Sequence, residues 1–350
     1  MKQEIRRIKP WVRWTAALLA LALIFIIGAQ SWTAVTISVQ ENNAAQTYLA
    51  EQTDYVNASQ VQRLRTKLQT LTQPVILEDY YRLAETHIAA EEYEQALACI
   101  GQCLELYRSE YGESLQADLL LKKGCLLTIL GRADEAETVM EQVVKVVPDL
   151  ADAYLVLAQL HAASGEIQAL AADLESYLDL QSDAADMRLL LAQVYLAQGQ
   201  TDAALEHAVL LYANGGAPDT DVAGLFTGLG LIRLRMEDVA GAFELFTTAL
   251  SLDDTIDSLC YYAGLCCLLL ERYDEAVDYY SRSIQQQSSV QMSCYGRGAA
   301  ELMRNEPNME QAAEDLIFAA EYDGADADPT INTQAQNLLN TLTQSNETTE

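Results

Sequence analysis

Residues 257–290 read DSLCYYAGLCCLLLERYDEAVDYYSRSIQQQSSV. The first half of this stretch places small and apolar residues at helical spacing: Leu259, Ala263, Gly264 and Cys267. After the polar turn at residues 271–273, the second half does the same with Ala276, Val277, Tyr280 and Ile284. The stretch therefore predicts two helices that pack through their apolar faces on either side of a short turn.

The same pattern recurs from Leu77 onward, with a small residue followed about twelve positions later by another. The seven pairs are Ala84 and Ala96, Gly124 and Ala136, Ala158 and Leu170, Ala192 and Ala204, Gly230 and Ala242, Gly264 and Ala276, and Gly298 and Ala312. Only Leu170 breaks the rule of small residues. We expect the two small residues to lie where the helices cross, since glycine or alanine there lets the backbones approach to about 8–10 Å. Such a period predicts a stacked array.

These units resemble tetratricopeptide repeats (TPR). One unit fills the family's slots with Tyr154, Leu157, Ala158, Gly165, Leu174 and Tyr177, and another with Phe226, Leu229, Gly230, Ala242, Phe246 and Ala249. The resemblance implies an all-α fold, a right-handed α-solenoid of about seven TPR helix-turn-helix units. The array is expected over residues 77–326, in units 77–110, 117–150, 151–184, 185–218, 223–256, 257–290 and 291–326.

The chain before the array differs in composition. A short basic tail, residues 1–13, precedes an uncharged apolar stretch at 14–35, which is long enough to cross a hydrocarbon core of roughly 30 Å. Tryptophans lie at both ends of the stretch, as in membrane-spanning helices. We expect one transmembrane signal-anchor helix, although the small residues at 29–31 leave a cleaved signal peptide open. The basic tail places the N-terminus in the cytosol and the array outside it, as in a single-pass protein of the bacterial envelope.

Two further segments flank the array. Residues 36–76 are a polar stalk in which an apolar stripe from Val61 to Leu71 predicts either a helix that caps the first unit or a short coiled coil. Asp328 and Pro329 read as a helix start, and the amphipathic stretch 328–343 is expected to cap the last unit. The tail 344–350 has nothing to bury and is expected to be disordered.

Composition excludes several function classes. The chain carries 51 acidic and 21 basic residues, a net charge of -30, so the array should repel nucleic acid. Its seven cysteines include no CxxC pair, and an odd number cannot all pair within one chain; we expect small buried side chains. The three histidines lack metal-ligand spacing, and the acidic run 323–328 lacks the glycine and glutamate of a calcium loop. We expect no catalytic residue, cofactor or metal ion, and hence no enzyme.

The TPR resemblance implies that the first helices of successive units line a concave peptide groove. The candidate groove residues are Tyr81, Leu121, Leu155, Gln159, Leu189, Gln193, Leu231, Leu234, Tyr261, Leu265, Leu268 and Tyr295. None is basic, so capture of a terminal carboxylate, as in chaperone-binding members, is not expected. Acids at the rim (Glu78, Asp118, Asp152 and Asp186) suit a hydrophobic partner segment with basic flanks. Alternatively, neighbouring repeats cover some of the leucines.

The function expected from these features is a membrane-anchored, extracytoplasmic protein-protein interaction scaffold. The array would bind peptide or protein partners, and residues 14–35 would hold it at the membrane. The alternative is a self-associating structural envelope protein, which forms oligomers through its stalk or its open ends. The sequence leaves the oligomeric state and the identity of the partner open.

Overall fold

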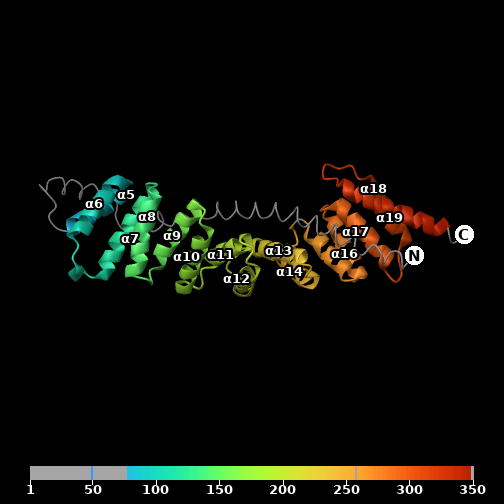
Figure 1. Ribbon diagram of the computed structural model, residues 1–350, viewed down its shortest axis with the longest axis horizontal. Helices are drawn as coiled ribbons and strands as arrows, with labels where there is room; N and C mark the ends of the chain where they lie inside the picture. Colours follow the sequence, from blue (N-terminus) through green and yellow to red (C-terminus); the bar gives the residue numbers. More distant parts are fainter. Residues whose placement is uncertain (1–48, 50–76, 257, 348–350) are drawn as a thin grey trace. The chain divides into compact units, whose positions relative to one another are not determined.

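The computed structural model describes residue 49 and residues 77–256 and 258–347, and most of these residues are helical (Figure 1). They form fifteen α-helices and one short 3-10 helix, η2 (Ser109–Tyr111), without a strand among them. No helix within this part of the chain has the length and apolar character needed to cross a membrane. The predicted tail 1–13, span 14–35 and almost all of the stalk 36–76 lie outside the described residues and stay predictions.

The first fourteen helices follow one another as seven helix-turn-helix pairs. The pairs are α5 (Leu77–Ala89) with α6 (Tyr93–Leu106), α7 (Glu113–Ile129) with α8 (Ala133–Val146), α9 (Ala151–Ser164) with α10 (Ile167–Leu180), α11 (Ala185–Ala197) with α12 (Thr201–Asn214), α13 (Asp219–Arg235) with α14 (Val239–Leu252), α15 (Leu259–Leu269) with α16 (Tyr273–Gln285), and α17 (Val290–Met303) with α18 (Met309–Glu321). Helices α7 and α13 begin four residues before the expected unit starts, because the inserted residues there add a helical turn instead of a loop.

The chain divides into two compact bodies, with the boundary inside α11 between Val194 and Tyr195. The N-terminal body contains the described residues up to Val194. The C-terminal body contains those from Tyr195 onward, including the last helix, α19 (Pro329–Glu347).

The turn inside a pair uses one backbone conformation. The fifteenth residue of each of the first six units has a positive φ: Glu91 at 58°, Gly131 at 72°, Gly165 at 78°, Gly199 at 73°, Glu237 at 63° and Glu271 at 64°. A left-handed residue at this point ends the first helix and lets the chain reverse. Glycine adopts the conformation without strain, whereas the three glutamates pay a steric cost for it.

The small residues of the first helices make room for large side chains of the second helices. A methyl group added to the glycine would lie 3.1 Å from Met140 Sδ at Gly124, 2.6 Å from Phe246 Cε1 at Gly230, 3.0 Å from Tyr280 Cδ1 at Gly264 and 2.9 Å from Leu316 Cγ at Gly298. Each large side chain lies four residues after the small residue of its own helix. The small residue of the first helix thus leaves room for a large side chain one turn further along the second helix; at Gly298 the added methyl group would also lie 3.1 Å from the carbonyl oxygen of Ala312.

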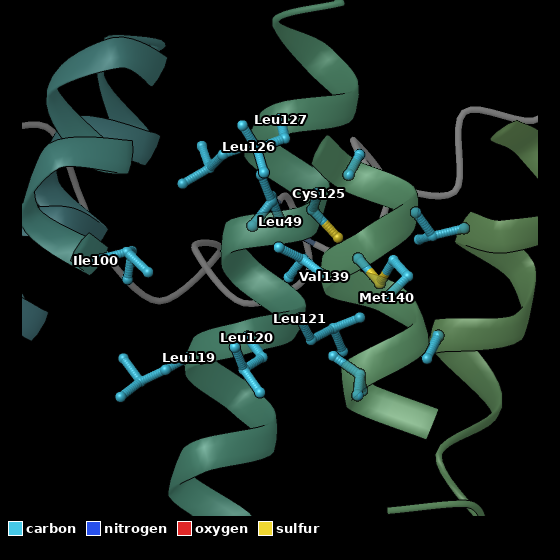
Figure 2. Packing of buried hydrophobic residues seen from close by; sticks show 14 of the residues in the cluster. Leu49, Ile100, Leu119, Leu120, Leu121, Cys125, Leu126, Leu127, Val139 and Met140 are labelled. Carbon is cyan, nitrogen blue, oxygen red and sulfur yellow. The ribbon is translucent and has the colours of Figure 1, made fainter. Parts of the chain in front are cut away.

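The core of the N-terminal body is built around α7, whose buried side chains point in several directions (Figure 2). Leu119, Leu121 and Leu126 are at most 1% exposed, and they pack in one cluster with Ile100 of α6 and Met140 of α8. This helix lies between its neighbours on both sides along the chain, which explains why side chains on several of its faces are buried. Burying each such leucine stabilises the fold by about 1.5–3 kcal/mol.

In the C-terminal body, α19 packs on the last helix pair. Ile331, Ala335 and Leu338 share a buried cluster with Leu316 of α18 and Tyr295 of α17. The helix begins at Pro329, and Oδ1 of Asp328 accepts a hydrogen bond from the backbone N–H of Thr330 at 2.7 Å. It continues to Glu347, so residues 344–347, which were expected to be disordered, are helical.

Candidate functional site

The predicted groove residues fall into two groups by exposure. Leu121, Leu231, Leu234, Tyr261, Leu265 and Tyr295 are at most 9% exposed. Tyr81, Leu155, Gln159, Leu189, Gln193 and Leu268 are half-buried. The first six are core residues because other side chains cover them: the ring of Tyr261, for example, lies 6.0 Å from that of Tyr280 on the neighbouring helix α16. The face that a ligand can reach is therefore smaller than the sequence predicts.

A polar cluster joins α5 and α7 in the N-terminal body. Lys122, only 1% exposed, donates from Nζ to Asp118 Oδ1 at 2.6 Å and to the Tyr81 hydroxyl at 2.8 Å. Tyr81 in turn donates to Asp118 Oδ2 at 2.7 Å, and Nζ lies 4.9 Å from the centre of the tyrosine ring. Each polar group of this cluster therefore has a hydrogen-bonding partner within the cluster. A charged side chain can be buried at low cost only when it is paired in this way.

The electrostatics of this cluster are acidic at its edge. Burial raises the pKa of Glu85, although Lys122 lowers it in part. Burial also raises the pKa of Tyr81 well above its usual range, with the hydrogen bond to Asp118 as the next cause. Asp152, on α9 of the same body, is exposed. With its one ammonium already bonded to Asp118, the cluster offers carboxylates to an incoming ligand.

Sequence reasoning missed Lys122 and Glu85. The family's groove positions exclude the sixth residue of a unit, where Lys122 lies, and include the ninth, where Glu85 was not singled out. The signal was present in residues 119–127, since a lysine that lies between two groups of leucines on a helix needs a partner where that part of the helix is buried.

A second polar cluster surrounds His161 where α8, α9 and α10 meet. Nδ1 of His161 lies 2.5 Å from Asp173 Oδ2 on α10, and Nε2 lies 3.4 Å from Glu137 Oε1 on α8. The ligand atoms of Glu137, His161 and Glu166 all lie within 4.8 Å of one another. The hydrogen bond to Asp173 is the main cause of the raised pKa of His161. His161 is buried, at 9% exposed, and carboxylates face both of its ring nitrogens.

The same slot carries a basic residue in two other units. His87, at the equivalent position, has Nδ1 2.7 Å from Oε2 of Glu92, and Arg233 reaches Asp238 at 3.2 Å. In each case the eleventh residue of the unit meets the sixteenth. The eleventh and sixteenth residues keep the same spacing in the sequence, so this pairing can be predicted. Partners from other helices, such as Asp173 of α10, can be identified only from the structure.

The thiols form no site of this kind. All seven cysteines are free and buried. Burial raises the pKa of Cys103 to about 12 and that of Cys294 to about 11. Thiols that stay protonated and buried are poor nucleophiles and poor metal ligands, so these side chains serve packing.

Three family models match the chain. Two are models of the tetratricopeptide repeat, which match residues 78–149 and 227–290. The third describes the second ARM domain of tetratricopeptide repeat protein 21 and matches residues 131–199. No curated protein is similar enough to the chain to be matched.

Solved structures are similar to the chain at low sequence identity. Naa15/Naa10 bound to HypK-THB is 13% identical, with a TM-score of 0.51 over 72% of this chain and 37% of that one. YrrB, a TPR protein with an unusual peptide-binding site, is 19% identical, with a TM-score of 0.43 over 57% of this chain and 97% of that one. A TPR protein from Parabacteroides merdae is 14% identical, with a TM-score of 0.39 over 74% and 97% of the two chains. The family matches and the paired helices together identify the chain as a tetratricopeptide repeat protein.

Proposed function

We propose that the chain is a membrane-anchored, extracytoplasmic protein-protein interaction scaffold. Its tetratricopeptide repeats support the scaffold part, since such repeats present the first helices of successive units to protein or peptide partners. The basic tail and apolar stretch before the array support the anchored part. That the protein is not an enzyme stays a prediction.

The observation that supports the scaffold is that first helices of the N-terminal body carry both half-buried leucines and carboxylates. Leu155 and Leu189 keep part of their surface open to a ligand on the first helices α9 and α11. Glu85 and Asp152 supply negative charge on α5 and α9 of the same body. An apolar segment with basic flanks matches both features, because burial of its side chains supplies affinity and the charges set its orientation.

Two peptides test this proposal on the detergent-solubilised full-length protein. They share an apolar centre, but one has lysine flanks and the other glutamate flanks. We expect fluorescence anisotropy to show binding of the lysine-flanked peptide, with an affinity that falls as salt is raised. Equal binding of the two peptides would refute the charge complementarity.

Matched leucine variants locate the binding face. Leu155→Glu and Leu189→Glu should each abolish binding of the lysine-flanked peptide. The control is Leu180→Glu, because Leu180 lies at the end of the second helix α10 and is 36% exposed. Circular dichroism checks that all three variants stay helical. If the control loses binding as fully as the two groove variants, the peptide binds elsewhere.

The anchor is tested separately in cells. We expect the protein to stay with membranes during alkaline extraction, and the array to be cleaved by a protease added outside the cytoplasmic membrane. A protected array would overturn the proposed orientation. Release into the soluble fraction would overturn the anchor but leave the scaffold intact.

The alternative function, self-association, has an observation of its own. Ile317 and Phe318 are adjacent on α18, in the last helix pair, and are 45% and 44% exposed. An interface between copies would cover such side chains. Sedimentation equilibrium of wild type and of the Ile317→Glu/Phe318→Glu variant decides this. A dimer that the variant loses supports self-association, whereas a monomer in both samples rejects this interface.

A further inference from the structure

The carboxylates around His161 suggest more than a structural ion pair. Glu137, His161 and Glu166 come from α8, α9 and the residue that caps α10, and each offers one ligand atom to a common point. Imidazole nitrogen combined with carboxylate oxygen is the donor set of Zn²⁺ and related divalent ions. We propose that these three residues bind a divalent transition-metal ion of the Zn²⁺ class, with Asp173 as the residue that positions the imidazole.

The distances fit an ion better than a hydrogen bond between His161 and Glu137. The separation of Nε2 and Oε1 is 3.4 Å, which is long for a charge-assisted hydrogen bond, normally about 2.7–2.9 Å. Two ligand atoms that are each about 2.0–2.1 Å from a tetrahedral ion lie about 3.4 Å apart. The three ligand atoms lie within 4.8 Å of one another, so each separation has to shorten by about 1.4 Å at most to reach 3.4 Å.

A metal-bound histidine usually donates a hydrogen bond from its other ring nitrogen, and Asp173 is the acceptor for His161. Its Oδ2 lies 2.5 Å from Nδ1, and the imidazole is 9% exposed, so this contact fixes the ring. With Nδ1 held as the donor, Nε2 presents its lone pair to Glu137 and Glu166. A carboxylate, a histidine and a metal ion arranged in this order form the usual support of such sites.

Glu166 provides the adjustable ligand and the route of entry. It is exposed and precedes α10 as its N-cap residue, but its side chain makes no capping hydrogen bond. Its backbone N–H donates to the carbonyl of His161 at 2.9 Å, so the turn holds the two residues close together. The carboxylate can therefore close on an ion while the backbone stays in place.

The equivalent slot in the first unit shows what a simple ion pair looks like. There Nδ1 of His87 contacts Glu92 itself, at 2.7 Å, and this histidine is not part of a three-ligand group among the described residues. At His161, Nδ1 faces Asp173 instead, which leaves the residue equivalent to Glu92 free to join Nε2. The difference in ring orientation separates a site for an ion from a paired histidine.

Calorimetric titration of the metal-free full-length protein with Zn²⁺ alone tests the proposal, with excess Mg²⁺ present to occupy the acidic surface. We expect one Zn²⁺ per chain, and a Co²⁺ visible spectrum typical of nitrogen and oxygen ligands. Glu166→Gln should remove this binding, and its exposed position protects the fold. Asp173→Asn should weaken binding by about 10–100-fold, and His87→Gln should leave it unchanged.

Two results would overturn the proposal. One is the absence of stoichiometric Zn²⁺ binding to wild type under these conditions. The other is binding that survives both Glu166→Gln and His161→Gln, because the ion would then be held by other carboxylates. In either case the cluster is a structural ion pair between His161 and Asp173.

Discussion

A single methyl group at residue 296 should destabilise the last two helix pairs. Gly296 lies in α17, and a Cβ atom there would lie 2.7 Å from both Cε1 and Cε2 of Tyr280. Ordinary contacts between carbon atoms are about 3.5–4.0 Å. The ring has no room to retreat, because Tyr280 is 1% exposed and a Cβ at Gly264, on α15, would lie 3.0 Å from its Cδ1.

The size of the effect follows from two opposing contributions. Overpacking of a buried site costs about 1–3 kcal/mol. Replacement of glycine by alanine inside a helix stabilises it by about 1 kcal/mol. Because the ring is confined on two sides, we expect Gly296→Ala to lower the free energy of unfolding by about 1–2 kcal/mol. The control is Gly224→Ala in α13, where no atom lies within 4 Å and a gain of about 0.5–1 kcal/mol is expected.

Urea unfolding followed by circular dichroism gives the free energies, and hydrogen exchange of α15–α17 shows where stability is lost, since repeat arrays open regionally. Gly296→Ala is then repeated in a Tyr280→Leu background, which removes the distal ring atoms. In the Tyr280→Leu background, Gly296→Ala should no longer lower the free energy of unfolding. The reasoning fails if Gly296→Ala is as stable as wild type, or if it costs the same with and without the ring.

Four further outcomes are expected. Gln334→Met should stabilise the C-terminal body by about 1–2 kcal/mol in urea unfolding, because neither amide atom of this buried side chain has a partner among the described residues. Glu237→Gly should raise the free energy of unfolding by about 0.5–1 kcal/mol, since it relieves a left-handed glutamate at φ 63°; a loss of stability would contradict the assigned strain. The raised pKa of Glu85 means that its favourable contribution is complete below the ordinary carboxyl pKa and is lost as the pH rises through the folded value. The stability of wild type relative to Glu85→Gln should therefore fall in thermal melts as the pH rises above the ordinary carboxyl pKa. None of the seven buried thiols should react with a thiol reagent within minutes in the native protein, whereas all should react in denaturant; rapid native labelling would show that the burial is wrong.

Sequence periodicity predicts helix pairing well, because the spacing of small and apolar residues directly encodes which faces pack. The turn after Leu130 and the helix start at Pro329 follow from local chemistry, since Gly131 and the Asp328-Pro329 pair each suit one backbone conformation. The contact that fills each glycine is harder to predict. Spacing alone does not say whether Gly230 meets Ala242 or Phe246, and the larger side chain occupies the space.

The candidate sites are less predictable, because their residues come from separate helices. Lys122 finds Tyr81 across 41 positions, and His161 finds Glu137 across 24, so neither pair appears as a local motif. Burial of the predicted groove depends on neighbouring units in the same way. Leu231 occupies a position that suits ligand contact in the family pattern, yet it is 1% exposed in the fold.

Several basic residues of the array are already paired with its own carboxylates, and this affects which partner segments the array attracts. Arg297 holds Asp315 through two nitrogens at 2.7 Å each, and Lys122 is buried against Asp118. Arg304 likewise links Asp274 and Glu301. These basic side chains pair with carboxylates of the chain itself, while the net charge of -30 leaves most carboxylates without a basic residue to match. A basic segment therefore gains attraction without having to displace these internal pairs, and an acidic segment finds few free cations. The steep salt dependence expected for the lysine-flanked peptide follows from this imbalance, whatever part of the array the peptide occupies.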